Sequence, residues 1–277
     1  MDDRSGTSLE SRATSTGTDA SSFPRVQETP RQGPVPCAFR EDWAEAFPWL
    51  IQGVTTRELD FRLFGASLEA GALDRWTALA EAHGIVRLAH ARQDHGAVVR
   101  THRAGAPGFI LSPPCDGHAT GDPGLLLTVT VADCVPVFLV APGRPAVALL
   151  HAGWRGVAGG ILEEGLGVLK DRFGVEPGQV QAHLGPAISG DRYEVGPEVH
   201  RALGFPDPGE PGLLDLRGAA AERLVEGGVP RERIGVSTRC SLEDPLFFSH
   251  RGGDDGRQVA FLGIRAGTEG GGGGRSP

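Results

Sequence analysis

Residues 131–156 read VADCVPVFLVAPGRPAVALLHAGWRG, two apolar runs joined by a short segment rich in proline and glycine. The runs consist mainly of Val, Leu, Ala and Phe, and their β-branched and aromatic members favour strands. The joining segment, 141–145, has the composition of a turn. The stretch therefore predicts a β-hairpin.

The register of this hairpin brings two reactive side chains together. If Ala141 lies opposite Ala146, antiparallel pairing places Pro136 opposite His151. Cys134 then becomes a diagonal neighbour of His151, at roughly 7–8 Å between the backbones. We expect the thiolate and the imidazole to converge on one ion or one substrate.

Mixed sulfur and nitrogen ligands suit zinc, which they bind at ~2.0–2.3 Å, and a catalytic zinc site needs only three protein ligands. The third ligand has several candidates among the remaining histidines. His95 is favoured because it lies in the polar tetrad 93–96 between two strand-like runs. Asp133 or another nearby carboxylate is expected to orient His151 from behind. The plainer alternative is that Cys134 only fills space in an apolar strand.

A glycine-rich turn follows His151 and leads into a predicted helix at Leu162. The free N–H groups of such a turn suit phosphate or another anion, and Arg155 adds a planar donor. Steric demand alone could also explain these glycines. The chain contains neither G-x-x-x-x-G-K-[ST] nor G-x-G-x-x-G, so triphosphate and dinucleotide sites have no support.

Around this stretch, helix-like and strand-like segments alternate irregularly. Apolar residues recur at helical spacing in 73–80, 162–173 and 216–224. Strand-like runs are 86–91, 125–131, 135–140, 146–150, 180–184, 234–238 and 259–264. The pattern predicts an α+β fold, a mixed β-sheet sandwich with packed helices in a single domain.

Composition sets the expected boundaries. Residues 1–36 have few large apolar side chains and are predicted to form a disordered N-terminal arm, and the glycine-rich segment 267–277 a flexible tail. The folded domain is expected at 37–266. With 42 glycines and 21 prolines in 277 residues, we expect a domain rich in turns.

Charge and hydropathy exclude several classes of protein. The net charge is −8, and the chain has no clustered basic run, so nucleic acid is not an expected partner. The apolar runs are far shorter than the ~20 residues that span a bilayer, so no membrane partner is expected either. The first residues, MDDR, do not begin a secretory signal, so we expect a cytoplasmic protein.

Five blocks of sequence together resemble the motifs of one family, in order along residues 50–264. They are Gln93-Asp-His95-Gly, Ala132-Asp-Cys134-Val-Pro-Val, His151-Ala-Gly-Trp-Arg-Gly156, Gly185-Pro-Ala-Ile-Ser with Tyr193-Glu-Val-Gly, and Phe248-Ser-His-Arg with Gly256-Arg257. The chain thus resembles the laccase-domain or polyphenol oxidase family, a multicopper-oxidase-like family of purine nucleoside phosphorylases. One departure is the segment 58–65, which follows Thr56-Arg57 and lacks the glycine-rich pattern of the family.

The resemblance implies a zinc ion held by His95, Cys134 and His151, with copper as an alternative metal. It implies phosphorolysis of adenosine, inosine and S-methyl-5'-thioadenosine, with adenosine deaminase activity in addition. A purine nucleoside and phosphate are therefore the expected partners. Arg57, Gln93 and Arg155 are candidates to bind the phosphate or the ribose.

Three alternatives remain. Cys134 could act as a nucleophile with His151 as its base, which would make the protein a Cys-His hydrolase. Copper-dependent phenol oxidation is less well supported, because one cysteine and two histidines leave no recognisable three-copper cluster. A metal-binding protein without catalytic activity is the third.

Overall fold

The hairpin forms as its sequence predicts in the computed structural model, which describes residues 20–64 and 71–266. Strand β10 (Val135–Ala141) pairs antiparallel with β11 (Ala146–Ala152). Ala141 lies opposite Ala146, and Pro136 lies opposite His151. The predicted register is therefore confirmed.

This hairpin is the centre of a seven-stranded sheet with the order β1-β15-β12-β10-β11-β8-β6, the first sheet. Its other strands are β1 (Arg25–Val26), β6 (Val99–Thr101), β8 (Gly117–Thr120), β12 (Gln181–Leu184) and β15 (Ile234–Ser237). A second seven-stranded sheet has the order β2-β3-β4-β16-β9-β5-β7. Its strands are β2 (Thr29–Arg31), β3 (Cys37–Phe39), β4 (Leu50–Thr55), β5 (Arg87–Ala91), β7 (Gly108–Ser112), β9 (Leu125–Val131) and β16 (Gln258–Ile264). Both sheets combine parallel and antiparallel pairs.

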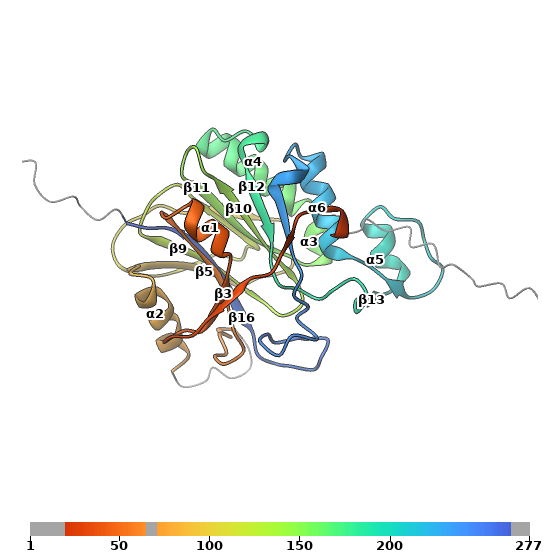
Figure 1. The fold of residues 1–277 in the computed structure, drawn as a ribbon, viewed down its shortest axis with the longest axis horizontal. Helices are drawn as coiled ribbons and strands as arrows, with labels where there is room; N and C mark the ends of the chain where they lie inside the picture. The colour runs from red at the N-terminus through yellow and green to blue at the C-terminus, as the bar shows by residue number, and fades with distance from the viewer. Residues whose placement is uncertain (1–19, 65–70, 267–277) are drawn as a thin grey trace, which may run out of the picture.

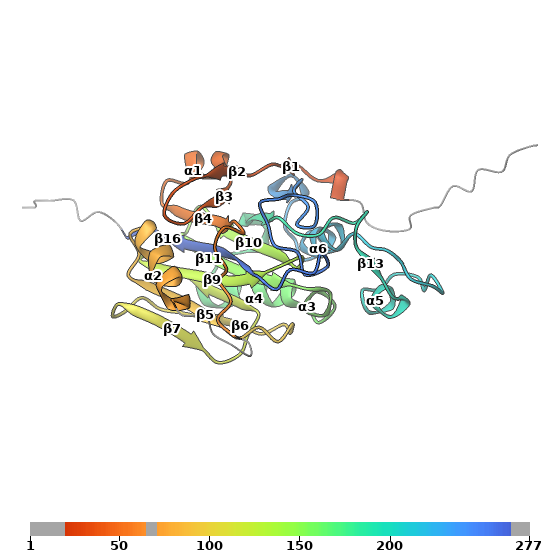
Figure 2. The same cartoon turned by 90° about the horizontal axis from the view of Figure 1, so that it is seen from below.

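The two sheets pack face to face, with helices on the outer faces (Figures 1 and 2). Phe138 and Leu149 of the first sheet share a buried core with Leu127 and Leu262 of the second. The opposite face of the first sheet is covered by α3, α4 and α6, with α5 packed against α3, and that of the second by α2, which buries Trp76. The helices are α1 (Glu41–Ala46), α2 (Ala72–Ala82), α3 (Trp154–Ala158), α4 (Ile161–Phe173), α5 (Pro197–Ala202) and α6 (Leu216–Glu226). A short pair, β13 (Glu194–Val195) with β14 (Gly212–Leu213), lies outside the two sheets.

The predicted α+β class, the mixed sandwich and the single domain are confirmed. The three predicted helices correspond to α2, α4 and α6, and every predicted strand is present. Short strands such as β6 and β8 escaped the sequence pattern because they have only three and four residues. Of the helices in the described residues, none is both long and apolar enough to cross a membrane.

The prediction of a disordered arm over 1–36 is wrong for residues 20–36. A 3₁₀ turn at Ala20–Ser22 and strands β1 and β2 lie in this segment. Phe23 is buried beneath the guanidinium of Arg231, and β1 and β2 are edge strands of the two different sheets, where they pair with β15 and β3. These partners are distant in sequence, so local composition does not reveal them. Residues 1–19 and the predicted tail 267–277 lie outside the described residues.

The site is positioned by two connections that pass from the second sheet to the first sheet. Residues 132–134 join β9 to β10, and residues 92–98 join β5 to β6. Strands β5 and β9 are parallel neighbours, so both connections leave from the same end of the second sheet. Because β10 and β11 are antiparallel, the end of β11 lies at that same place.

Candidate metal centre

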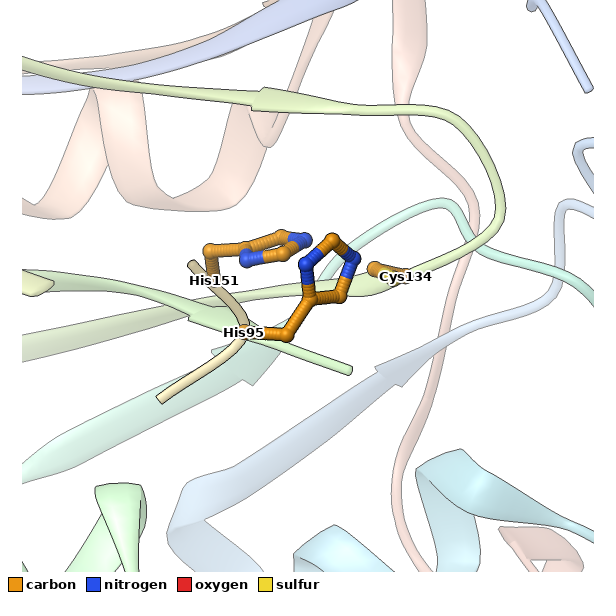
Figure 3. A group of neighbouring side chains, drawn as sticks. All are labelled: His95, Cys134 and His151. Carbon is orange, nitrogen blue, oxygen red and sulfur yellow. The ribbon is translucent and has the colours of Figure 1, made fainter. Parts of the chain in front are cut away.

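His95, Cys134 and His151 form one cluster, with a ligand atom of each within 4.8 Å of the other two. His95 comes from the β5–β6 connection, Cys134 from the corner before β10, and His151 from β11. Figure 3 shows the three side chains converging from these separate segments. The two imidazole rings stand edge to face, with centroids 4.9 Å apart. The structure thus brings together the three residues that the sequence nominated as ligands.

The corner that carries Cys134 is held in an uncommon backbone conformation. Asp133 has φ +83°, a left-handed value that costs a residue other than glycine about 1–3 kcal/mol. Its carboxylate accepts hydrogen bonds from the Ser241 hydroxyl at 2.6 Å and the Arg251 backbone N–H at 2.7 Å. Asp133 therefore fixes the turn before Cys134, and it does not orient His151 as the sequence suggested.

The carboxylate behind His151 belongs to Asp116, a residue that the sequence analysis did not nominate. Asp116 Oδ1 lies 2.8 Å from His151 Nδ1 and accepts the backbone N–H of His95 at 3.0 Å. Its other oxygen accepts the N–H groups of Asp94 and Gly96. One carboxylate therefore orients the His151 ring and also holds the loop in which His95 has φ +59°. Since Nδ1 of His151 is engaged, Nε2 is the atom available to a metal.

The cluster is arranged as a thiolate beside a charged imidazole. Burial on its own raises the pKa of the Cys134 thiol, but the charge of His151 and hydrogen bonds from both histidines outweigh it and lower the pKa to about 6. Burial lowers the pKa of His151, but Cys134 and Asp116 together raise it to about 9. A thiol that ionises this easily is ready to bind a metal or to attack an electrophile.

The residues around the cluster leave room for its sulfur and ring atoms. A Cβ atom on Gly153 would lie 3.1 Å from both Cys134 Sγ and His95 Cδ2, tighter than most side-chain contacts. Glycine at this position therefore keeps the space between the ligands clear. With an oriented histidine, a second histidine and an acidic thiol, the donor set fits zinc with a position left for water or substrate.

The cluster opens on a cavity of about 320 Å³. This volume is at the lower end of the ~300–1,000 Å³ typical of small-molecule sites. Arg62, Arg92, Arg257 and His250 line it on the polar side, and Leu63 and Phe64 are among its apolar walls. The cavity therefore joins a candidate metal centre to cationic groups and an exposed aromatic ring.

The three sequence candidates for phosphate or ribose differ in their positions. Gln93 lines the cavity, but its amide is hydrogen-bonded to Thr130. Arg57 pairs with Asp254 at 2.9 Å, Arg155 stacks on Trp154, and neither is among the described residues that line the cavity. The cationic lining comes instead from the three arginines named above, whose directions the sequence did not reveal.

The glycine-rich turn after His151 also differs from its prediction. It does not run directly into the helix at Leu162, because the short helix α3 intervenes before Gly160 begins α4. Gly156 lies against the backbone of the His95 loop, where a Cβ atom would come within 2.9 Å of the Gly96 carbonyl oxygen. Close packing is therefore one reason for glycine in this turn.

Comparisons with known proteins agree on one family. The family model described as multi-copper polyphenol oxidoreductase laccase matches residues 70–265. A protein of Geobacillus stearothermophilus named purine nucleoside phosphorylase YlmD is 37% identical over 207 residues, which cover 70% of this chain and 73% of the relative. A purine nucleoside phosphorylase of Xylella fastidiosa is 35% identical over 153 residues, covering 51% of this chain and 57% of the relative.

A solved structure shares the fold. The crystal structure of YlmD from Geobacillus stearothermophilus superimposes with a TM-score of 0.75 and 30% identity. The match covers 86% of this chain and all of the solved chain. The similarity thus extends over both sheets and not only over the motifs around the cluster.

Proposed function

This chain belongs to the multi-copper polyphenol oxidoreductase laccase family, and from that premise we propose that it is a zinc-dependent purine nucleoside phosphorylase. The proposed substrates are adenosine, inosine and S-methyl-5'-thioadenosine with phosphate, and deamination of adenosine is proposed as a second activity. The observation that carries the proposal is the His95, Cys134 and His151 cluster at the base of a cavity lined by three arginines. The relatives named purine nucleoside phosphorylase supply the reaction class.

His95, Cys134 and His151 would hold the zinc ion. When bound, zinc would polarise an oxygen of phosphate or acidify a water molecule. Asp116 keeps His151 in one tautomer by its hydrogen bond to Nδ1, and it fixes His95 through the backbone of residues 94–96. These contacts place both rings before any substrate arrives, so little reorganisation is needed on binding.

The arginines provide the anion site of the proposed reaction. Arg92 lies in the segment that carries His95. Its Nε forms an ion pair with Asp94 Oδ1 at 3.0 Å. Arg257 fixes its own loop through backbone carbonyls, including that of Asp255 at 2.9 Å. Guanidinium groups match the oxygen geometry of phosphate, so we assign the phosphate to this side of the cavity.

The apolar wall provides a platform for the purine. The ring of Phe64 is 42% exposed and stacks on His90 with an interplanar angle of 20° and centroids 5.9 Å apart. His90 is buried against Trp76, which keeps the stack rigid. A planar base would lie on the free face of Phe64. Phe64 lies in the segment 58–65, which departs from the family pattern.

Product analysis tests the proposal. Zinc-loaded protein is incubated with adenosine with and without phosphate, and the products are separated by chromatography. Adenine that forms only with phosphate is the expected result of phosphorolysis, and inosine formed without phosphate is the expected result of deamination. Unchanged adenosine in every reaction would refute the proposal.

The arginine assignment has its own matched pair of variants. Arg92→Gln removes a cation that lines the cavity, and we expect the KM for phosphate to rise about tenfold, equivalent to ~1.4 kcal/mol, with a smaller change in the KM for nucleoside. Arg57→Gln removes an arginine that pairs with Asp254 outside the cavity wall, and the KM for phosphate should stay within about twofold. Equal effects in the two variants would contradict the assignment.

A second candidate function rests on the same cluster. Cys134, His151 and Asp116 lie in the order nucleophile, base and orienting carboxylate, an arrangement that also serves covalent catalysis. In the hydrolase interpretation the Cys134 thiolate binds no metal, whereas in the phosphorylase interpretation it is a metal ligand.

Alkylation separates the two interpretations. In chelator-treated protein, the iodoacetamide rate at Cys134 should rise with pH through about 6, because the thiolate forms above the lowered pKa. Cys37 should react much more slowly than Cys134, because it is buried and burial raises the pKa of its thiol. Zinc should protect Cys134 and leave Cys37 unchanged. A purified protein that contains zinc and still alkylates quickly at Cys134 would favour the hydrolase.

Copper-dependent phenol oxidation has less support from the described residues. Among them, His95, Cys134 and His151 are the one group of three or more ligands close enough to share an ion. A three-copper cluster needs more histidines than this group provides.

A further inference from the structure

A second cavity, of about 520 Å³, lies at the turn of the β10–β11 hairpin, whereas the candidate metal centre lies at the open end. Ala146 of β11 lines this cavity, and His151 is five residues further along the same strand. At about 3.3–3.4 Å per residue, the two positions are roughly 17 Å apart. The second cavity is therefore a separate place in the molecule.

The lining of this cavity is cationic in a protein whose net charge is −8. Arg103, Arg144 and Arg172 line it together with one carboxylate, Asp122. Three guanidinium groups against one carboxylate leave an excess of positive charge. Arg103 follows β6, Arg144 lies in the hairpin turn and Arg172 is in the last turn of α4, so the cations come from three separate segments.

Much of this charge has no partner in the described part of the chain. Neither Arg103 nor Arg172 makes an ion pair or a side-chain hydrogen bond there. Arg144 donates one N–H to the Phe173 carbonyl at 2.9 Å, and an Asp122 oxygen accepts the Ala104 backbone N–H at 2.8 Å. The cavity thus presents guanidinium donors that its own carboxylate does not neutralise.

The inner wall of the cavity contains a buried polar group, His102, which is 9% exposed. Its Nε2 lies 2.8 Å from Nδ1 of His118, and the Cys115 sulfur lies 3.9 Å from Nδ1 and 4.0 Å from Nε2 of His118. Burial raises the pKa of the Cys115 thiol to about 11, so it keeps its proton. Burial, helped by neighbouring arginines, lowers the pKa of His102 to about 4, so its ring is neutral.

The tautomers of the two rings depend on each other, because one ring must donate across the 2.8 Å contact. An anion in the cavity would favour the pair in which His118 Nδ1–H donates to His102 Nε2. Neutral His102 then carries its proton on Nδ1. This N–H has no hydrogen-bond acceptor in the described residues, and it belongs to a side chain that lines the cavity. In this tautomer the wall adds a donor to the three arginines.

We propose that this second cavity is a binding site for a small anion that carries two or more phosphate charges. Arg103, Arg144 and Arg172 would hold the phosphate oxygens, and the His102 Nδ1–H would donate from the inner wall. Charge-assisted hydrogen bonds of this kind are the strong ones. The volume exceeds what a single orthophosphate ion needs, so a diphosphate or a phosphorylated metabolite fits the site better.

The test is isothermal titration of the full-length, zinc-loaded protein with inorganic pyrophosphate at low and moderate salt. In Arg103→Glu/Arg172→Glu, one equivalent of binding should disappear, or its Kd should rise at least tenfold. Both side chains are exposed, so the fold should remain intact, which circular dichroism checks. Arg25→Glu is the control for net charge and is compared with Arg172→Glu alone, which changes the charge equally; β1 forms the opposite edge of the same sheet.

A second variant tests the inner wall. His102→Phe removes the donor and should weaken pyrophosphate binding while all three arginines stay in place. The proposal is wrong if wild-type protein binds no pyrophosphate, or if the double variant keeps every equivalent. Equal weakening in Arg25→Glu and in Arg172→Glu would show only a general effect of net charge and would overturn the assigned site.

Discussion

Two buried histidines in this molecule each face a carboxylate at the same distance. His151 Nδ1 lies 2.8 Å from Asp116, and His183 Nε2 lies 2.8 Å from Glu28. The side chains of both pairs are almost fully excluded from solvent. By distance and burial alone, either pair could belong to an active site.

The second neighbour of each ring separates them. His151 faces Cys134, and the thiolate together with Asp116 raises the pKa of His151 to about 9 in spite of burial. His183 instead lies against the rings of Phe138 and Trp43. Burial there outweighs the carboxylate and lowers the pKa of His183.

The two carboxylates also hold different things. Asp116 holds a loop that carries another ligand, His95. Glu28 accepts the Ser237 hydroxyl at 2.9 Å and thereby fastens the segment between β1 and β2 onto the first sheet. A histidine with a carboxylate partner is therefore not by itself a sign of catalysis. The role of such a histidine depends on the groups that contact the other side of its ring and on whether that side faces a cavity.

The largest expected effect comes from removing the sulfur. Cys134→Ala deletes one of three proposed ligands, so bound zinc and phosphorolysis should both fall by more than about 100-fold, beyond the effect of losing an outer partner. Zinc content by atomic absorption and adenine formation are the measurements. The control Cys37→Ala removes another buried cysteine in β3 and should keep the metal. Full activity of Cys134→Ala would contradict the assignment of a catalytic role to the His151 pair and not to the His183 pair.

A smaller effect is expected from the carboxylate behind His151. Asp116→Asn keeps the shape but weakens the hold on the His151 ring and on three backbone N–H groups, so zinc affinity should fall about 10–100-fold. Competition with a chelator of known affinity measures it. The corresponding variant of the second pair, Glu28→Gln, should leave zinc affinity unchanged. If the two variants lost zinc equally, the distinction between the two pairs would not hold.

The smallest effect concerns stability at the second pair. Glu28→Gln replaces a charged acceptor by a neutral one, and we expect a loss of about 1 kcal/mol, the difference between the two kinds of hydrogen bond, in the free energy of unfolding at pH 7. Urea titration followed by circular dichroism gives the value. An unchanged midpoint would show that Glu28 is not the anchor of this segment.

The same pair predicts how wild-type stability depends on pH. The pKa of Glu28 is below 4.5, because His183 and Ser237 outweigh burial, and the pKa of His183 is below 6.5 because of burial. Both groups are deprotonated more easily in the folded state, so their contributions are complete above pH 6.5 and decrease as the pH falls. Wild-type protein should lose stability from pH 7 to pH 4 in urea titrations, and Glu28→Gln should lose more, because the carboxylate no longer raises the pKa of His183 against burial.

Part of the fold could be predicted from the sequence because its signals are local. The apolar runs and the turn at 141–145 define the hairpin, and a period of two fixes which residue faces which, so the pairing of Pro136 with His151 followed. The segment 20–36 could not be predicted in this way. Its order depends on β15, β3 and Arg231, which are distant in the chain.

Only the site residues with a local sequence signal could likewise be predicted. Cys134 and His151 follow from the hairpin register, and His95 from its polar tetrad between two strands. Asp116 was missed because β8, which it precedes, has only four residues and no long apolar run. Arg62, Arg92 and Arg257 were missed because an arginine in a loop gives no sign of the direction in which it points.

Titration of metal-free protein with zinc, followed by phosphate-dependent adenine formation at each step, tests the central claim most directly. If His95, Cys134 and His151 form a catalytic zinc centre, activity should be absent at first and rise in proportion to zinc until one ion is bound per chain. Full phosphorolysis by the chelated protein, or a rise that needs more than one zinc per chain, would contradict it.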